Sequence, residues 1–370
     1  MKVLLTVVVA LFLCLFSIYS STSFSAQTQT TGSVGDALSS DSTRGFLRAD
    51  KPRIFTFPKD EGAHPKYQTE WWYYTGNLVT KKNRRFGFQF TIFRRAILPQ
   101  KQQRKSPWVS NQIYFAHFAV SDISGKRFLH SERFSRGAMG LAGTQKNPTK
   151  IWIENWFIEN SKQTHVVART KEYSIDLKMT SLKEPVLNGK KGLSQKSSGK
   201  GNASYYYSVT RLQTQGAITL GNEKYEVTGL SWLDREWSTS VLGKEQIGWD
   251  WFSIQLNDSR EIMLYQLRLK DNKIDPHSSG TFIFADGKYQ PLKHGDFSIT
   301  VLDHWLSPKS NIRYPARWKI EIPKYNLNLE IKPYLANQEL LLNFAYWEGA
   351  VSVKGKGISG NGYVEMTGYD

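Results

Sequence analysis

The sequence predicts an all-β protein of many antiparallel strands joined by short turns. Its runs alternate strictly between apolar and polar side chains, which is typical of strands with one buried face. In YSIDLKMT, for example, the apolar members are Tyr173, Ile175, Leu177 and Met179. Turn sequences that indicate hairpins separate such runs, at 81–84, 221–224, 257–260 and 285–288. Helical periodicity is nearly absent, so sandwiches or up-and-down barrels are the expected architectures.

The chain also repeats one β-unit. WWYYTGNL at 71–78 is similar to WDWFSIQL at 249–256, and each is followed by a turn and a strand ending in arginine. Late in each half come related endings, YEVTGLSW at 225–232 and YVEMTGYD at 363–370. The common order predicts two copies of one unit, with a boundary near 242–246.

The N-terminus has the pattern of a secretory signal peptide. Lys2 precedes an apolar run from Val3 to Tyr19, and small and polar residues follow as far as Ala26. An uncleaved anchor helix is the alternative for this run. We expect a secreted or periplasmic protein with a signal peptide at 1–26, a polar flexible tail at 27–50, an N-terminal domain at 51–243 and a C-terminal domain at 244–370.

Composition narrows the chemistry. Cys14 is the only cysteine and lies inside the predicted signal peptide, so the mature chain has no disulfide and no cysteine ligand. The seven histidines are far apart in sequence, so we expect no metal and no cofactor. The net charge of +17 suits an anionic membrane surface or an acidic ligand, or serves solubility alone. Export argues against a nucleic-acid partner. The basic tract at 188–201 is predicted to be a flexible loop.

Two motifs point to common enzyme classes that the sequence does not support. GKGISG at 355–360 matches the dinucleotide-binding fingerprint, but a turn and a strand follow it where that site needs a helix. No G-x-S-x-G sequence is present, so a serine nucleophile on a strand-to-helix turn is not predicted.

Acids embedded in aromatic runs are the most informative feature. Burial among indole rings favours the neutral carboxyl and raises its pKa, so such an acid can donate a proton near neutral pH. Aromatic faces can also stabilise a carbocation until water attacks it. The structural alternative is a buried acid paired with an arginine, such as Arg94, Arg211, Arg235 or Arg268. The acids concerned are Glu70, Asp234, Glu236, Asp250 and Glu348.

Alternation divides these residues between faces. In SWLDREW, Trp232, Asp234 and Glu236 share one face of the expected strand. In TEWWYYTG, Trp71 and Tyr73 point one way, while the opposite face carries Glu70, Trp72 and Tyr74. Which face lines a ligand pocket is left open by the pattern.

The longer motifs resemble the AttH/CrtC family, and more closely its AttH branch. They are HPKYQTEWWYYTGNL, RRFGFQFTIFR, AHFAVSD, ERFSRGAMGLAG, YYYSVTRL, GLSWLDREWS, GWDWFSIQL, YWEGAV and GNGYVEMTGY, from His64 to the C-terminus. The resemblance implies two tandem lipocalin-like antiparallel β-barrel domains with a cavity for a hydrophobic ligand at or near their junction. It also implies activities such as water addition to an isoprenoid double bond, and an association of AttH members with ABC-type lipid export systems.

The resemblance carries over to catalytic residues only in part. Carotenoid 1,2-hydratases are thought to use an aspartic acid as proton donor, and Asp234 is the candidate by position. Their Tyr-x-Asp element corresponds to Tyr265-Gln266-Leu267, where Leu267 replaces the acid.

The predicted function is therefore an exported protein that binds an isoprenoid or acyl ligand and hydrates or isomerises it. The alternatives are a non-catalytic lipid carrier that works with an ABC-type exporter, and a module that binds a membrane surface. The predicted catalytic residues are Asp234 and Glu236. The predicted ligand-binding residues are Glu70, Trp72, Tyr74, Trp237, Trp249, Trp251, Tyr265, Arg268 and Glu348.

Overall fold

The computed structural model describes residues 43–369, apart from 101–105, 107, 241, 272 and 344. The predicted signal peptide and most of the predicted tail lie outside the described residues. The described part belongs to one compact unit. It is built of strands, with two short 3₁₀ turns, η1 (Lys59–Glu61) and η2 (Pro323–Tyr325). Its helical segments include none with the length and apolar character needed to cross a bilayer.

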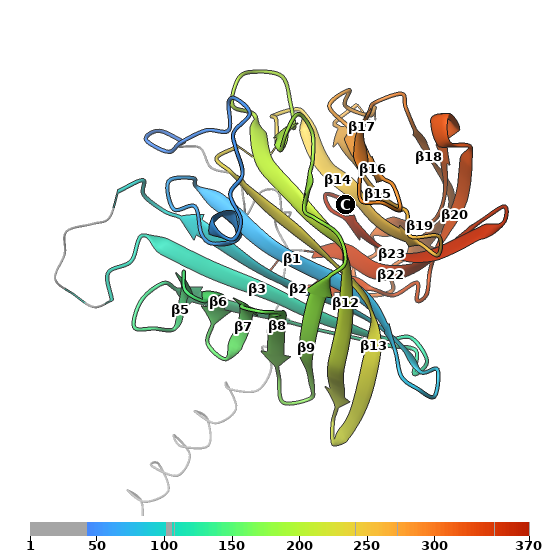
Figure 1. The fold of residues 1–370 in the computed structure, drawn as a ribbon, viewed down its shortest axis with the longest axis horizontal. Helices are drawn as coiled ribbons and strands as arrows, with labels where there is room; N and C mark the ends of the chain where they lie inside the picture. The colour runs from blue at the N-terminus through green and yellow to red at the C-terminus, as the bar shows by residue number, and fades with distance from the viewer. Residues whose placement is uncertain are drawn as a thin grey trace, which may run out of the picture. The chain divides into compact units, whose positions relative to one another are not determined.

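The first sheet is antiparallel and contains 13 strands in the order β4-β3-β2-β1-β13-β12-β9-β8-β7-β6-β5, with β10 and β11 paired to β12. Strands β3 and β4 also contact β5 and β6, so the sheet curls until its two ends approach, as a nearly closed barrel (Figure 1). The strands are β1 (Thr69–Val79), β2 (Arg85–Ala96), β3 (Gln112–Asp122), β4 (Arg127–Arg136), β5 (Ala142–Gln145), β6 (Thr149–Ile153), β7 (Trp156–Asn160), β8 (Thr164–Arg169), β9 (Tyr173–Ser181), β10 (Val186–Leu187), β11 (Leu193–Gln195), β12 (Ala203–Leu220) and β13 (Glu223–Ser238).

The second sheet is also antiparallel and contains 10 strands in the order β17-β16-β15-β14-β23-β22-β20-β19-β18, with β21 paired to β22. It curls only part of the way, as a half-barrel, because its end strands β17 and β18 do not pair with each other in the described part of the chain. The strands are β14 (Gln246–Leu256), β15 (Glu261–Leu269), β16 (Ser279–Ile283), β17 (Tyr289–Lys293), β18 (Ser298–Leu306), β19 (Arg313–Ile322), β20 (Leu327–Pro333), β21 (Glu339–Leu341), β22 (Ala345–Gly355) and β23 (Ile358–Met366).

The strand content confirms the all-β prediction. The two sheets also share part of their strand order, in agreement with the predicted repeat. The series β2-β1-β13-β12 in the first sheet corresponds to β15-β14-β23-β22 in the second. The predicted alignment of residues 225–232 with 363–370 is out of register, however. If Tyr73 and Trp251 are equivalent, their cross-strand partners Asp234 and Glu365 are equivalent too. The extra length lies in β13, which begins at Glu223 as the arm of a long hairpin with β12.

The junction between the sheets is an apolar core of its own. A cluster of buried side chains from both sheets fills it, including Tyr73, Trp232 and Trp251. The backbones approach closely there, since a Cβ atom on Gly87 of β2 would lie 2.6 Å from the Cβ of Ala350 on β22.

Buried polar contacts also cross the junction. The carboxylate of Glu261 on β15 accepts hydrogen bonds from Arg211 on β12 and, at 2.7 Å, from Lys183. The amide of Gln255 donates to the carbonyl oxygen of Thr210 at 2.7 Å, and that of Asn77 donates to the carbonyl oxygen of Gly362 at 3.0 Å. The sheets are therefore joined by burial and by ion pairs.

Two segments that the sequence predicts to be flexible make contacts with the first sheet. Residues 43–50 lie against the first sheet, where Ala49 is fully buried and Arg48 donates to Asn202 at 2.7 Å. The tract at 188–201 contains strand β11, and its Ser194 and Ser197 are buried. The prediction of a flexible loop for this tract was wrong in part, because residues 193–195 pair with the first residues of β12, a part of β12 that does not pair with β9.

Candidate functional site

A cavity opens at the junction of the two sheets. The space between its walls, including open solvent at its mouth, is about 800 Å³. Strands β1, β2, β12 and β13 form one wall, and β14, β15, β22 and β23 form the other. Aromatic side chains dominate both walls: Trp71, Tyr73, Phe93, Tyr206, Trp249, Trp251, Tyr265 and Tyr346. The arrangement suits a ligand with a large apolar body.

Period-two alternation decides which aromatic residues reach the cavity. On β1 the side chains of Trp71 and Tyr73 face it, while Trp72 and Tyr74 point into the core of the first barrel. On β14, Trp249 and Trp251 face it from the other side. The rings of Tyr73 and Trp251 meet edge to face, with centroids 5.2 Å apart. The corresponding faces of the two repeated strands therefore look at each other.

Asp234 on β13 is a buried acid in the cavity wall. It is 3% exposed, its Oδ1 accepts a hydrogen bond from Ser208, and its Oδ2 has no hydrogen-bond partner among the described residues. Burial raises the pKa of Asp234 to about 7, and the neighbouring Glu236 adds to the rise, against weaker opposing contacts from Ser208, Trp232 and Tyr206. A substantial fraction of Asp234 is thus a neutral acid at neutral pH, and its Oδ2 makes no hydrogen bond at normal distance to the described residues.

Glu236, on the same face of β13, has a different environment. The ammonium of Lys196 lies 3.1 Å from its Oε1, and the hydroxyl of Ser204 donates to the same atom. Burial of Lys196 works against its charge, but the carboxylate of Glu236 raises the pKa of Lys196 above its ordinary value. The ammonium also lies 4.1 Å from the ring centroid of Tyr265. Of the two predicted catalytic acids, Glu236 is engaged in an ion pair and Asp234 is not.

A second group of acids comes from the opposite wall. Glu348 on β22 and Glu365 on β23 are direct cross-strand neighbours, and both line the cavity. Glu348 is fully buried, whereas Glu365 keeps some exposure because it faces the open space. Burial raises the pKa of both carboxyls, Glu365 adds to the rise at Glu348, and Asp234 and Glu236 add to the rise at Glu365.

A family model described as AttH-like matches residues 48–369. This chain belongs to the AttH-like family. The crystal structure of a protein assigned to AttH from Nitrosomonas europaea has a TM-score of 0.79 and 30% identity, and the match covers 88% of this chain and 100% of that one. The resemblance inferred from the motifs is therefore confirmed.

Two further proteins are similar to this AttH-like chain. Kievitone hydratase from Nectria haematococca has a TM-score of 0.64 at 16% identity, over 87% of this chain and 97% of that one, which shows a shared fold. The dehydratase asqC from Emericella nidulans is 23% identical over 230 residues. That match covers 60% of this chain and 64% of the curated relative's length.

The predicted site residues fall into two groups. Those that line the cavity of this AttH-like protein are Asp234, Glu236, Trp249, Trp251, Tyr265 and Glu348. Those that lie elsewhere are Glu70, Trp72, Tyr74, Trp237 and Arg268. Of these, Arg268 forms an ion pair with Asp250 at 3.2 Å, and its guanidinium lies over the ring of Tyr369.

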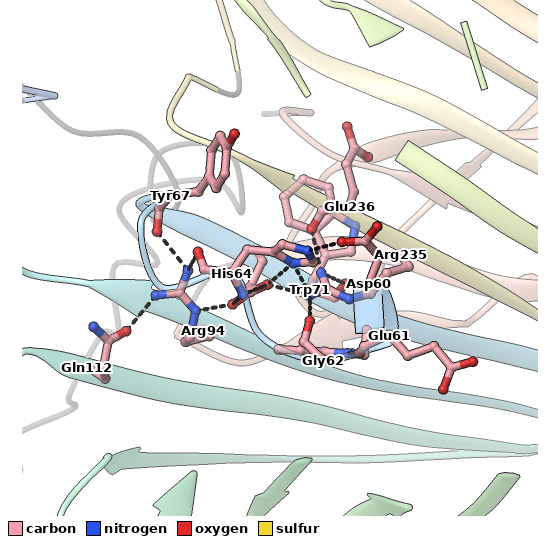
Figure 2. Close-up of polar contacts among 12 residues, drawn as sticks. Asp60, Glu61, Gly62, His64, Tyr67, Trp71, Arg94, Gln112, Arg235 and Glu236 are labelled. Atoms are coloured by element: carbon pink, nitrogen blue, oxygen red, sulfur yellow. Dashed lines mark hydrogen bonds and ion pairs between the residues drawn. The ribbon is translucent and has the colours of Figure 1, made fainter. Parts of the chain in front are cut away.

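Glu70 occupies a buried ion-pair network on the face of β1 that points away from the cavity. Figure 2 shows Arg94, Arg235 and His64, which belong to this network. The two oxygens of Glu70 accept hydrogen bonds from Arg94 of β2 and Arg235 of β13. His64 caps it through its backbone N–H at 3.0 Å, and the imidazole stacks on Trp237 at 3.8 Å between centroids. Burial opposes ionisation, but the two arginines hold the pKa of Glu70 well below its usual range. Glu70 therefore fastens the segment before β1 to the barrel, as in the structural alternative of an acid paired with arginine.

Several cavity residues were missed by reasoning from sequence: Trp71, Tyr73, Lys196, Tyr206, Tyr346 and Glu365. Trp71 and Tyr73 were visible in the sequence, but alternation does not say which face packs on the second sheet. Glu365 could have been found by aligning SWLDREW with GYVEMTG, because this alignment makes Glu365 the equivalent of Asp234 in the second unit.

Groups of three or more metal-ligating side chains do not occur within the described ranges. The carboxyls of the cavity are distributed over facing walls or engaged by Lys196. What this arrangement can do chemically is donate and accept protons beside an apolar ligand.

Proposed function

We propose that this AttH-like chain adds water to, or removes it from, a carbon–carbon double bond of a hydrophobic ligand held in the junction cavity. One observation carries the proposal: Asp234 is a buried carboxyl in an aromatic cavity wall, and burial raises its pKa to about 7. A general acid is most effective when its pKa is near the working pH. The names of two similar proteins, a hydratase and a dehydratase, support the same reaction class.

In the hydration direction, Asp234 transfers its proton to one alkene carbon, and the π electron pair becomes the new C–H bond. The second carbon is left as a carbocation beside the faces of Tyr73, Trp249 and Trp251, which stabilise positive charge. Water then attacks that carbon and loses a proton. Dehydration is the same path in reverse, with a neutral acid protonating the departing hydroxyl.

The resemblance offers two positions for the hydratase aspartate, Asp234 and the end of the Tyr-x-Asp element, and the second is held by Leu267, which lines the cavity. The proton donor must therefore come from another strand. Asp234 on β13 faces the same space as Leu267 and Tyr265 of β15. We infer that the acid is supplied by the first sheet in this chain, and that Leu267 adds apolar surface for an isoprenoid or acyl body.

The test uses solvent isotopes with a panel of linear isoprenoid olefins and their tertiary alcohols. In D₂O and ¹⁸O-enriched water, the wild-type protein should introduce deuterium and labelled oxygen into a matching probe. Asp234→Asn should lower the rate about 100-fold or more, consistent with loss of a general acid. Asp250→Asn is the matched control, since Asp250 is equally buried but pairs with Arg268 outside the cavity. Full activity and ligand binding in a folded Asp234→Asn, Glu236→Gln double variant would refute the proposal.

A non-catalytic lipid carrier that works with an export system is the second candidate, and Leu267 in place of an acid is the observation that favours it. Both candidates use the same cavity. Extraction of the purified protein followed by mass spectrometry separates them. An unaltered lipid that exchanges with vesicles supports a carrier, and a product that differs from its precursor by one water supports the enzyme. Secretion or periplasmic location belongs to both proposals and is tested by fractionating cells.

A further inference from the structure

We propose that Glu348 and Glu365 form a carboxyl pair that shares one proton and acts as the base for the attacking water, opposite the acid Asp234. This inference rests on the proposed function and names the residues that complete it. The active site would then take its acid from one sheet and its base from the other.

The two glutamates lie next to each other on the cavity face of the second sheet. Glu348 and Glu365 are directly opposed across β22 and β23, so their side chains emerge side by side on the cavity face. In the described chain neither oxygen of Glu348 has a hydrogen-bond partner at normal distance, although Tyr73 and Tyr346 approach it closely enough to favour its ionised form slightly. No lysine or arginine forms a salt bridge with either glutamate in the part of the chain that the structure describes. Two adjacent buried carboxyls without a cation cannot both ionise readily, so they retain a proton between them.

The repeated β-unit relates Glu365 to Asp234. Asp234 lies opposite Tyr73 in the first sheet, and Glu365 lies opposite Trp251 in the second, so the two acids hold equivalent places on facing walls. Their next neighbours differ. Across the following strand, Asp234 meets Ser208, which donates a hydrogen bond, whereas Glu365 meets Glu348. Asp234 is thus an isolated acid, whereas Glu365 belongs to a pair. Such a difference in environment separates the acid role from the base role.

A tyrosine held by a buried histidine lies beside the pair. Tyr346, two residues before Glu348 on the same face of β22, is fixed by a hydrogen bond of 2.7 Å between its hydroxyl and Nδ1 of His117 on β3. His117 is fully buried, and burial lowers its pKa to about 3, so the imidazole is neutral and adds no positive charge beside the glutamates. The Tyr346 hydroxyl is therefore held in place by a neutral group. His117 adds no positive charge that would fully ionise the pair.

Asp234 gives its proton to the alkene carbon and becomes a carboxylate. A water oxygen forms the C–O bond with its lone pair, and the proton that it loses passes to the singly protonated Glu348–Glu365 pair, which becomes doubly protonated. Solvent at the cavity mouth then returns one proton from the pair to Asp234, and the site is restored without any oxidant or reductant.

The test combines infrared spectroscopy with the isotope assay. At pH 7 the wild-type protein should show the carbonyl band of a protonated buried carboxylic acid that changes in both Glu348→Gln and Glu365→Gln, because one proton is shared. Each variant should also lower ¹⁸O incorporation about 100-fold. Glu339→Gln is the matched control, since Glu339 is a buried glutamate on the adjoining β21 that bonds Ser307 and Tyr314 and does not line the cavity.

The possible failures are distinguishable. Absence of the shared band, or full activity in a folded Glu348→Gln, Glu365→Gln double variant, overturns the role of the pair while an inactive Asp234→Asn leaves the proposed function standing. A shared band together with a fully active Asp234→Asn overturns Asp234 and retains the pair. If the wild-type protein labels no probe, the proposed function and the base role fall together.

Discussion

At the scale of single residues, surroundings rather than residue type decide what each carboxyl can do. Glu70 lies between two arginines and is held ionised, Glu236 is paired with Lys196, and Asp234 makes no ion pair in the described chain and has neutral neighbours such as Ser208. All three belong to the set of acids among aromatic residues that the sequence singles out. The sequence cannot separate them, because the partners come from strands and loops distant in the chain.

The neutral state of Asp234 leads to a prediction about stability. Its pKa rises from 3.8 to about 7 on folding, so the stabilisation it contributes is complete below about pH 4 and is lost as the pH rises through 7. Asparagine stays uncharged at every pH. The free energy of unfolding of Asp234→Asn, measured relative to that of the wild type, should therefore increase from pH 5 to pH 8 by up to a few kcal/mol. Urea unfolding of both proteins at the two pH values measures it, and a difference that does not change with pH would contradict the raised pKa.

Asp234 should also control the reaction rate. If it is the acid, activity falls as the pH rises through about 7, because the donor is lost. Asp234→Glu, which keeps a carboxyl in a changed position, should retain a pH limb with an altered midpoint. A rate profile that is flat from pH 5 to pH 9 would exclude Asp234 as the donor.

At the scale of elements, the alternation along β1 carries most of what the sequence could predict and also its main ambiguity. The period-two pattern correctly predicts strands and correctly divides TEWWYYTG into two faces. It does not say which face meets the second sheet, because both faces are buried and both are aromatic. The predicted ligand-binding set therefore contains Trp72 and Tyr74, whereas Trp71 and Tyr73 line the cavity.

The two tryptophans at the centre of this strand should respond differently to the same substitution. Trp72→Phe removes a 2.8 Å hydrogen bond to the carbonyl oxygen of Glu61 and weakens the stacking of Arg235, so it should cost about 1–3 kcal/mol of stability. Trp71→Phe should leave stability nearly unchanged and weaken binding of a fluorescent polyene fatty acid. Calorimetry and fluorescence titration give both quantities, and the reverse pattern would mean that the cavity face is misassigned.

The ion pairs of Glu70 should hold the segment before β1 against the first sheet. Glu70→Gln leaves Arg94 and Arg235 buried without their anion, so it should cost about 3–5 kcal/mol and expose residues 43–68 to proteolysis. Glu61→Gln is the control, because Glu61 makes only a 3.1 Å hydrogen bond to Asn160 and burial already raises its pKa. Equal stability and protease resistance in the two variants would show that the network contributes little.

At the scale of the whole molecule, the cavity exists only where the two sheets meet. The sequence predicts two β-units and a boundary, and the family resemblance places a cavity near the junction. Neither source predicts the buried contacts that join the units, such as Arg211 with Glu261, because such pairs connect residues about 50 positions apart. A site whose walls come from both units requires them to be held at a fixed distance.

The last prediction follows from that requirement. Glu261 is fully buried and accepts from both Arg211 and Lys183, so Glu261→Gln leaves two cations at the junction without their counter-ion. We expect a loss of about 3–5 kcal/mol, a lower unfolding temperature and weaker ligand binding, even though Glu261 does not line the cavity. The wild type should unfold in a single calorimetric transition, because the junction is one of its apolar cores. Glu330→Gln is the control, since its pair with Arg317 is exposed and should be worth less than about 1 kcal/mol. Two separate transitions in the wild type, or a Glu261→Gln variant as stable as Glu330→Gln, would mean that the sheets fold independently and that the cavity is not held by their junction.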